Sequence, residues 1–266
     1  MSEADADGTV SFDDALDAGA LRQAFVRVDE SMRERRDHLC DLDGVIGDAD
    51  HGVTMVTGFK AVRAALDALG EEATPSDVLN AAAKAFLNAV GASAGPLYAT
   101  AFMRGAASAK GRDALDADGV AALIAAMAEG IGARGKAETG DKTMYDAWHP
   151  AGEAATAAAA EANASVAGVL RAAAEAADAG ARATIGLQAR KGRSAKLGER
   201  SVGHMDAGAA STSLLLHALA GVDAADSAAA RAAEGAGEGS ATSGAGEDGD
   251  APTRPSGGER REEPGS

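Results

Sequence analysis

The stretch Leu42-Asp-Gly-Val-Ile-Gly-Asp-Ala-Asp-His51 contains three carboxylates, those of Asp43, Asp48 and Asp50, followed directly by an imidazole. The glycines between them allow backbone turns that bring separated side chains together. Carboxylates held a few ångströms apart repel one another unless a cation balances them, and Mg2+ prefers a tight shell of oxygen ligands. An Asp/Gly-rich stretch is also typical of a solvated turn. The rest of the chain must therefore decide between a metal site and a turn.

The composition of the chain favours helix over sheet. Alanine dominates the 266 residues, aromatic residues make up only 3%, and runs of β-branched residues are scarce. A chain of this length can also bury a sizeable core. We therefore expect an all-α protein.

The net charge argues against one class of partner. Asp and Glu outnumber Lys and Arg by 41 to 25, which gives a formal charge of -16. Nonspecific binding of nucleic acid depends on Lys and Arg side chains that neutralise phosphates, so we expect no nucleic-acid partner. The acidity suits a halophilic, salt-rich cytoplasm, which we favour, although it also serves ordinary solubility.

The sequence indicates a cytoplasmic protein. Cys40 is the single cysteine, so no intramolecular disulfide can form, and this is compatible with a reducing compartment. The first residues are acidic and carry no apolar targeting segment. No window contains eighteen apolar residues in a row. We expect no membrane insertion.

Apolar residues recur at helical spacing through most of the chain. Ser11 and Asp14 can form a capping box for one long helix that leads to Asp43. Thr74-Pro75 predicts another helix start, and Asp118 can cap a later helix. Counting the segments gives about eight helices.

The ends of the chain differ from its middle. Residues 1–10 are predicted to be a flexible tail. Residues 223–266 contain no Val, Ile, Leu, Met or aromatic residue, so nothing there offsets the entropy of ordering. The sequence therefore predicts a helical domain over residues 11–222, followed by a disordered acidic tail.

Four polar, glycine-bearing loops separate the helical segments: the aspartate stretch and residues 91–96, 135–144 and 191–208. If neighbouring helices alternate in direction, loops spread along the chain gather at one end of a bundle. That end would offer carboxylates for a metal, backbone N–H groups for phosphates, and Lys191 and Arg193 as counter-charges. This combination predicts a nucleotide site.

Three other motifs lack the structural context that they need. Asp41-Leu-Asp-Gly-Val45 matches the haloacid-dehalogenase phosphatases, in which Asp41 would be the nucleophile at the end of a buried strand, but the charged residues 33–38 before it are helical in pattern. Residues 135–143 look like a P-loop with one residue inserted, and a P-loop also needs a preceding strand. The aspartate spacing does not fit an EF-hand.

Together the four stretches resemble the DhaL family, the nucleotide-binding L subunits of dihydroxyacetone kinase. The resemblance covers residues 15–222 and rests on four motifs in order. They are Leu42-Asp-x-x-Ile-Gly-Asp-x-Asp-His-Gly52, Gly91-Ala-Ser-x-Gly-Pro-Leu-Tyr98, Gly135-Lys-Ala-Glu-x-Gly-Asp-Lys-Thr-Met144, and Lys191-Gly-Arg193 with Leu197-Gly-Glu-Arg-Ser-x-Gly-His-x-Asp-x-Gly-Ala209. The resemblance implies an antiparallel eight-helix barrel that holds ADP or ATP and two Mg2+ ions at one end.

The resemblance also implies roles for individual residues. Asp43, Asp48 and Asp50 would be metal ligands that bridge to phosphate oxygens. Ala92 and Ser93 would hold phosphate, Gly135 and Met144 would flank the adenine, and Arg193 would reach the nucleotide. The residues that would lie along the nucleotide or close the site are His51, Gly52, Val53, Thr54, Asp206, Ala207 and Gly208.

The chain departs from the family pattern beside these positions. The family usually has Gly where this chain has Ala49, Pro where it has Thr139, and Gln and Pro where it has Met205 and Ala207. A left-handed backbone at Ala49 would cost about 1 kcal/mol. No ligand is removed by these differences. His204 receives no catalytic role.

The resemblance implies the ADP-binding subunit of a phosphoenolpyruvate-dependent dihydroxyacetone kinase. In that system an M subunit phosphorylates ADP held on the L subunit, which passes the phosphoryl group to dihydroxyacetone on the K subunit. We expect this chain to be too short to contain the K domain. Two alternatives stay open: the L subunit of an ATP-dependent kinase, and a nucleotide-loaded regulatory binding module. A homodimer is compatible with the sequence.

Overall fold

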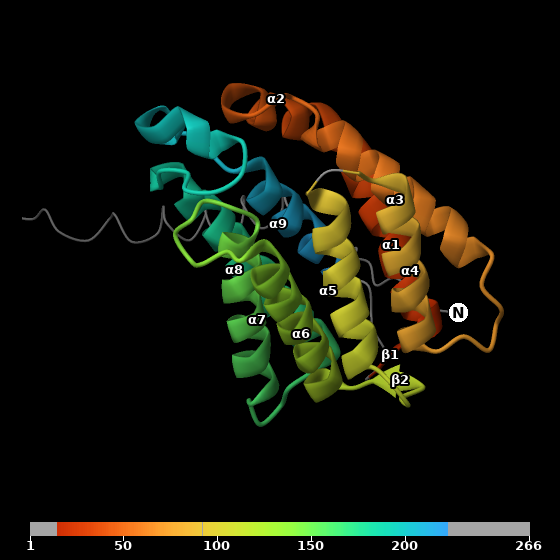
Figure 1. Ribbon diagram of the computed structural model, residues 1–266. Coiled ribbons are helices and arrows are strands. Elements are labelled where there is room, and N and C mark those ends of the chain that lie inside the picture. Colours follow the sequence, from red (N-terminus) through yellow and green to blue (C-terminus); the bar gives the residue numbers. More distant parts are fainter. Residues whose placement is uncertain (1–14, 92, 223–266) are drawn as a thin grey trace, which may run out of the picture. The chain divides into compact units, whose positions relative to one another are not determined.

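The computed structural model describes residues 15–91 and 93–222 (Figure 1). The predicted tails at 1–10 and 223–266, and the predicted capping pair Ser11 and Asp14, lie outside these residues. The helices are α1 (Ala18–Glu34), α2 (Arg36–Ile46), α3 (His51–Asp67), α4 (Pro75–Ala89), α5 (Ala94–Ser108), α6 (Ala117–Gly135), α7 (Tyr145–Ala159), α8 (Val166–Ala183), α9 (Ala207–Ala220), and the 3-10 helices η1 (Thr184–Gly186) and η2 (Ser194–Ser201). The two-residue strands β1 (Leu16–Asp17) and β2 (Ala114–Leu115) pair antiparallel. The prediction of an all-α fold is confirmed.

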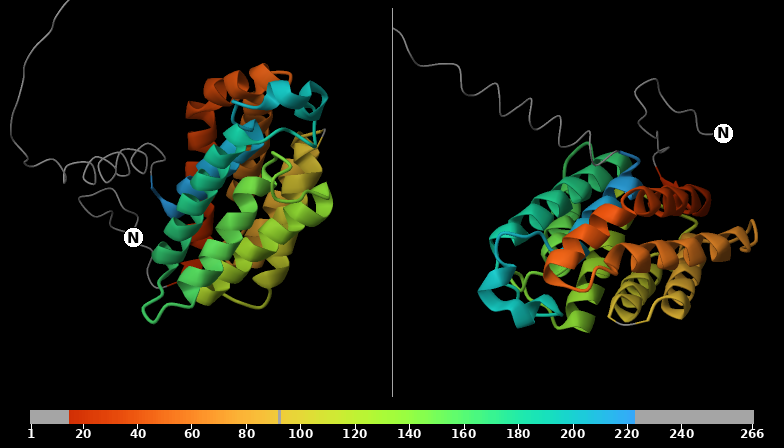
Figure 2. Two further views of the ribbon diagram at one scale, coloured as in Figure 1. Left: turned by 90° about the vertical axis from the view of Figure 1, so that its left-hand side faces the viewer. Right: turned by 90° about the horizontal axis from the view of Figure 1, so that it is seen from above.

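Eight of the described helices form a closed ring. In sequence order α1, α3, α4, α5, α6, α7, α8 and α9 each pack against the next, and α9 packs back against α1. Neighbouring helices run in opposite directions, while α2 extends the ring at one end, where it packs on α3 and α9 (Figure 1, Figure 2). The expected antiparallel eight-helix barrel is therefore present, with α2 as an additional helix.

Two predictions about helix ends were wrong. The single long helix expected before Asp43 is broken at Arg35, so that α2 leaves the ring while α1 remains in it. The side chain that caps α6 belongs to Asp116, which accepts the N–H of Gly119 at 2.8 Å. Asp118 lies instead in the first turn of α6, where its charge favours the helix N-terminus. The start of α4 was predicted correctly, with Thr74 as its cap.

The core of the ring has an aromatic half and an alanine half. Phe25, Phe59, Phe86 and Phe102 come from α1, α3, α4 and α5, and their rings meet edge to face, with centroids 5.2 to 6.4 Å apart. On the opposite side, the buried residues of α7 and α8 are mainly alanines, and Trp148 of α7 is the one aromatic side chain among them. This division explains how a chain so poor in aromatic residues fills its core. Among the described helices, none has the length and apolar character that crossing a bilayer requires.

Gly58 shows how tightly the aromatic half is packed. A Cβ atom at this position in α3 would overlap three ring atoms of Phe86 on α4. Gly70, by contrast, has no atom within 4 Å of the place where its Cβ would be. The two glycines form a matched pair for testing the packing of α3 against α4.

We predict that Gly58→Ala lowers the free energy of unfolding by about 1–3 kcal/mol, since overpacking a core costs this much. Gly70→Ala should change it by less than about 1 kcal/mol. Urea unfolding followed by far-ultraviolet circular dichroism measures both values. Equal midpoints for the two variants would contradict the packing described for Phe86.

Candidate functional site

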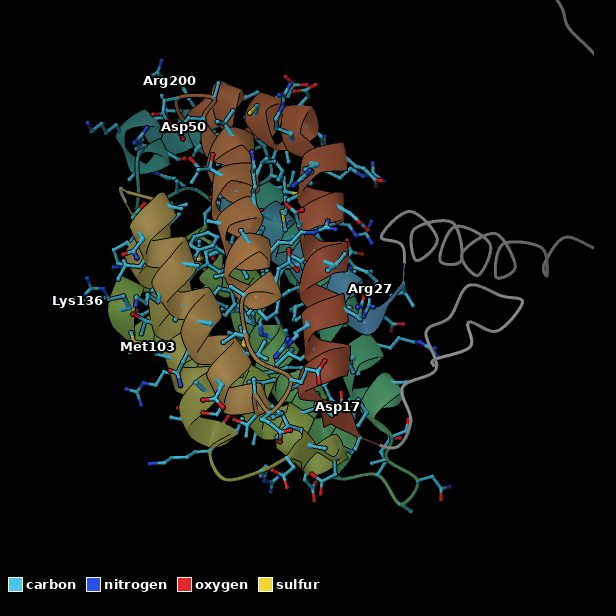
Figure 3. All side chains as sticks on the ribbon, turned by 90° about the vertical axis from the view of Figure 1, so that its right-hand side faces the viewer. Asp17, Arg27, Asp50, Met103, Lys136 and Arg200 are labelled. Atoms are coloured by element: carbon cyan, nitrogen blue, oxygen red, sulfur yellow. The ribbon has the colours of Figure 1, made fainter. Side chains whose placement is uncertain are left out.

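The loops at one end of the ring enclose a cavity of about 580 Å3. Because the helices alternate in direction, the α2–α3, α4–α5, α6–α7 and α8–α9 connections all meet at this end. Figure 3 shows Asp50 and Arg200 there, opposite Asp17. The predicted site residues that line the cavity are Asp43, Asp48, Asp50, His51, Thr54, Ser93, Gly135, Met144, Arg193, Asp206, Ala207 and Gly208.

Two of the predicted site residues that the structure describes, Gly52 and Val53, do not line the cavity. Gly52 is buried in the first turn of α3, where a Cβ atom would overlap the carbonyl oxygen of Arg36. Its lack of a side chain therefore lets α2 and α3 approach each other. Val53 is 53% exposed and does not line the cavity. Ala92 lies outside the described residues.

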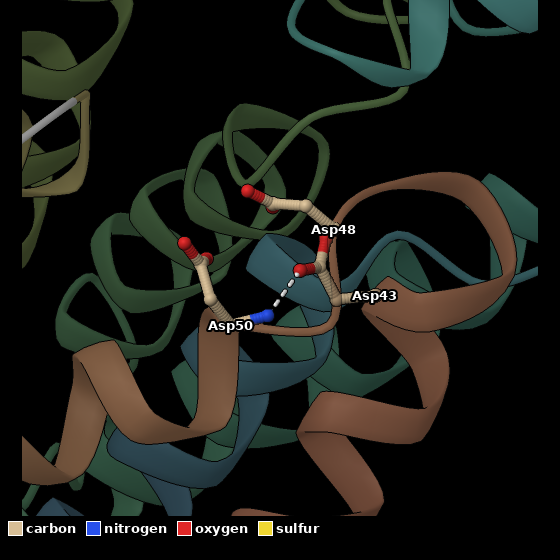
Figure 4. A group of neighbouring side chains, drawn as sticks. All are labelled: Asp43, Asp48 and Asp50. Atoms are coloured by element: carbon tan, nitrogen blue, oxygen red, sulfur yellow. Dashed lines mark hydrogen bonds between the residues drawn. The ribbon is translucent and has the colours of Figure 1, made fainter.

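The carboxylates of Asp43, Asp48 and Asp50 converge at the α2–α3 turn (Figure 4). Each offers one oxygen, and these oxygens all lie within 4.8 Å of one another. The side chain of Asp43 is held by the turn itself, because its Oδ2 accepts the N–H groups of Asp50 at 3.0 Å and of His51 at 3.3 Å. Ala49 has a left-handed backbone, with φ of 60°, which is the conformation that costs a residue other than glycine about 1 kcal/mol.

Arg193 supplies positive charge to this cluster from a distant part of the chain. Its Nη1 atom forms ion pairs with Asp48 and, at 3.8 Å, with Asp50. Three carboxylates that need a cation, placed beside a cavity, form the hard oxygen donor set that Mg2+ prefers. The residues present therefore fit a divalent metal ion.

His51 lines the cavity as a neutral imidazole. Its burial lowers its pKa to about 4, although the nearby charge of Asp43 acts in the opposite direction. The ring Nε2 lies 2.8 Å from Ser211 Oγ, and this hydroxyl donates to the carbonyl oxygen of Gly208 at 3.0 Å. Ser211 thus links the imidazole of His51 to the first turn of α9.

The opposite wall of the cavity is apolar. Leu97, Ile131 and Met144 contribute side chains from three different segments, close to Gly135. The turn that leads to Met144 is shaped by Asp146, whose two carboxylate oxygens accept the N–H groups of Gly140 at 2.5 Å and Thr143 at 2.8 Å. One end of the cavity thus carries charge and the other end can hold a flat apolar group.

Sequence reasoning missed several residues of the wall. The side chains of Leu97, Ile131 and Arg134 face the cavity, although their helical spacing gave no reason to separate them from the residues of the helix interior. Lys142 is also in the wall and is only 1% exposed. Its one signal in the sequence is its place in the Gly-Asp-Lys-Thr turn at 140–143.

Asp206 begins α9 at the edge of the cavity and caps that helix by accepting the N–H of Ala209 at 2.8 Å. Burial raises the pKa of Asp206 to about 7, and the charges of Asp146 and Asp43 act in the same direction. The N–H of Ala209 and the ammonium of Lys142 oppose this increase. The carboxyl group can therefore change its charge near neutral pH.

Comparison with known families agrees with this arrangement. The DAK2 domain matches residues 45–221, which is more than half of the chain. The chain belongs to the DAK2 domain family. The resemblance to DhaL proteins that the four motifs suggested is thereby confirmed, because curated DhaL subunits are among the relatives of this DAK2 domain protein.

Several relatives match the DAK2 domain protein over most of their own length. The ADP-binding subunit DhaL of the phosphoenolpyruvate-dependent dihydroxyacetone kinase of Escherichia coli K12 is 41% identical over 196 residues, which cover 74% of this chain and 92% of the relative. The DhaL subunit of the PTS-dependent dihydroxyacetone kinase of Lactococcus lactis is 35% identical over 194 residues, with coverage of 73% and 91%.

Longer kinases contain a similar region. The D-erythrulose kinase of Mycolicibacterium smegmatis is 37% identical over 206 residues, which make up only 35% of that relative. The crystal structure of the dihydroxyacetone kinase of C. freundii in its native form gives a TM-score of 0.60 at 25% identity, covering 83% of this chain and 37% of that one. Its complex with AMP-PNP and Mg2+ gives a TM-score of 0.59. The DAK2 domain protein thus spans about a third of these kinases.

We predict that Asp206→Asn changes how the stability of the ligand-free protein depends on pH. The native Asp206 carboxyl keeps its proton up to about pH 7, whereas an unfolded carboxyl loses it near 3.8. A rise from pH 4 to pH 8 should therefore destabilise the natural protein relative to the variant, by on the order of 1–3 kcal/mol. Asn also caps helices, so the start of α9 is preserved.

Urea unfolding in the presence of a metal chelator, at several pH values, measures this difference. The two proteins should have similar free energies of unfolding near pH 4, where both side chains are neutral. A difference that stays constant from pH 4 to pH 8 would contradict the raised pKa of Asp206.

Proposed function

We propose that this chain is the cytoplasmic ADP-binding subunit of a phosphoenolpyruvate-dependent dihydroxyacetone kinase. It would pass a phosphoryl group from its nucleotide to dihydroxyacetone held by a K subunit, and an M subunit would rephosphorylate the bound ADP. The observation that carries the proposal is the cavity with carboxylates at one end and an apolar wall at the other, in a member of the DAK2 domain family.

The charged end of the cavity suits the phosphates. Asp43, Asp48 and Asp50 would hold two Mg2+ ions, which neutralise phosphate charge and orient the transferred group. Ser93 and the first turn of α5 would direct N–H groups towards a phosphate. Arg193 would stabilise the charge that develops on the phosphoryl oxygens.

The apolar wall suits the base. Leu97, Ile131 and Met144 would enclose the adenine beside Gly135, with Arg134 at the same wall. The neutral imidazole of His51, fixed through Ser211, would lie along the nucleotide between the two ends. The roles of the site residues are thus divided between positioning and charge neutralisation, which dominate phosphoryl transfer.

The side chains of the cation site are open to solvent. Those of Asp48 and Asp50 are 44% and 58% exposed, and that of Arg193 is 55% exposed. An open site accommodates an acceptor delivered by another subunit, which is the arrangement that the proposed kinase needs. The DhaL relatives of Escherichia coli and Lactococcus lactis, which are 41% and 35% identical, are named as subunits of a phosphoenolpyruvate-dependent and a PTS-dependent kinase. These names favour this function over the ATP-dependent alternative. A homodimer stays a prediction.

We predict that the purified protein retains ADP through exhaustive dialysis in Mg2+ and salt, as detected by nucleotide analysis and mass spectrometry. Mixed with K and M subunits, phosphoenolpyruvate and the general phosphotransferase proteins, it should support phosphorylation of dihydroxyacetone without added ATP. Omission of the M subunit is the control. Transfer that requires free ATP and ignores the M subunit would overturn the phosphoenolpyruvate-dependent function.

We also predict that Asp48→Asn weakens Mg2+-dependent ADP binding at least about 10-fold, since even the loss of an outer-shell partner of a metal costs this much. Isothermal titration calorimetry with and without Mg2+ measures the effect, and circular dichroism should show unchanged helicity. Asp41→Asn is the matched control, because Asp41 is exposed on α2 and does not line the cavity.

The Asp41→Asn control also distinguishes a nucleotide-binding protein from a phosphatase of the haloacid-dehalogenase type. A phosphatase of the haloacid-dehalogenase type would lose activity in the Asp41→Asn protein and would tolerate the Asp48→Asn change. Normal ADP affinity in Asp48→Asn would count against the metal site.

A further inference from the structure

Lys142 is a buried lysine in the wall of the cavity. The proposed phosphoryl transfer assigns it no role. Its side chain is only 1% exposed and is among the largest fully buried side chains of the described residues. Its backbone is left-handed, with φ of 61°, a conformation that is uncommon for a residue with a long side chain. The turn around Lys142 must therefore be stabilised by contacts that compensate for the strain.

The ammonium of Lys142 connects segments that are far apart in the sequence. Its Nζ donates to the carbonyl oxygen of Thr184 at 2.5 Å, where α8 ends, and to the carbonyl oxygen of His204, just before α9. Charged donors form stronger hydrogen bonds than neutral ones. One side chain thus joins the turn before α7 to both ends of the α8–α9 connection, residues 184–206.

Neighbouring contacts join the same two segments. The carbonyl oxygen of Asp141 accepts the N–H of Arg190 at 3.0 Å, and the carboxylate of Asp141 lies 3.7 Å from the ammonium of Lys191. Within the connection itself, the N–H of Asp206 donates to Thr184 Oγ1 at 3.0 Å and so joins its two ends. The α8–α9 connection, which carries Arg193 to the cation site, is therefore fastened along the turn that contains Lys142.

The charge of Lys142 has two carboxylates, those of Asp206 and Asp146, near it. Burial lowers the pKa of Lys142, and the charges of Asp206 and Asp146 act in the opposite direction. A buried ion costs more than a buried apolar side chain unless its partners are well placed. For Lys142 the carbonyl oxygens of Thr184 and His204 and the carboxylates of Asp206 and Asp146 supply such partners.

We propose that Lys142 is a positioning residue of the nucleotide site. It fastens the turn before α7 to the α8–α9 connection, and so holds Met144, Arg193 and the start of α9 around one cavity. The expected effect on nucleotide affinity rests on the proposed function. The tether, by which we mean the hydrogen bonds from Lys142 to Thr184 and His204, can be measured without any ligand.

Lys142→Met tests the inference because methionine keeps most of the apolar stem and removes the charge and the donors. At 10 °C, where the folded state should dominate, we predict that its affinity for ADP with Mg2+ falls about 10- to 100-fold, the cost typical of misplaced positioning groups. In the ligand-free protein, amide hydrogen exchange of Arg190, Gly203 and Asp206 should become about 10-fold faster. Titration calorimetry and exchange followed by mass spectrometry measure the two effects.

Gly58→Ala is the matched control for general loss of stability, because Gly58 lies in the aromatic half of the core and does not line the cavity. It should bind ADP with natural affinity and keep the exchange rates of residues 184–206. If Lys142→Met does not fold, Lys142→Gln, which keeps a shorter neutral donor, makes the same comparison.

The outcomes separate this inference from the proposed function. A natural protein that binds no ADP would overturn the function, while the exchange rates would still test the tether. Natural ADP affinity in the Lys142 variant, or exchange no faster than in Gly58→Ala, would overturn the positioning role alone.

Discussion

The mutual repulsion of three carboxylates is the constraint on which the rest of this site depends. Asp43, Asp48 and Asp50 offer oxygens within 4.8 Å of one another, which is unfavourable unless positive charge or N–H donors face them. The fold supplies both locally: two backbone N–H groups bind the carboxylate of Asp43, and Arg193 approaches from the α8–α9 connection. A metal ion bound here would neutralise the negative charge that these N–H groups and Arg193 leave uncompensated.

Arg193 can reach the aspartates only because neighbouring helices of the ring alternate in direction. Only then do four connections, the first at residues 47–50 and the last at residues 184–206, meet at one end of the ring. The approach of α2 to α3 at this end depends on a small residue, because a Cβ atom at Gly52 would overlap the carbonyl oxygen of Arg36. The glycine therefore helps to place the α2–α3 turn, which carries the aspartates, at this end of the ring.

Much of this could be predicted from the sequence because its signals are local. Helical spacing predicted about eight helices, the family resemblance implied that they form a barrel, and Thr74 predicted a helix start. Four glycine-bearing loops predicted that a site would form at one end of the helices. The break at Arg35 was missed because apolar residues keep the helical spacing across it, from Met32 to Leu39. The cap at Asp116 was missed because Asp118, two residues later, is an equally good capping residue. Lys142 was missed for a different reason. Its partners are backbone carbonyl oxygens 42 and 62 residues away, and a carbonyl group has no signature in a sequence.

The two kinds of charge at this cavity serve different purposes. Lys142 is buried, and its ammonium donates to backbone carbonyl oxygens, so its charge stabilises the wall of the cavity. The charges of Asp48, Asp50 and Arg193 are half exposed, so water screens them in the isolated chain. On the proposed function, a K subunit that covers the cavity would exclude this water and strengthen every interaction with the transferred phosphoryl group. The exposed charges of Asp48, Asp50 and Arg193 would thus reach their full electrostatic effect only in the complex with the K subunit. The buried Lys142 would hold the cavity wall in place before that subunit binds.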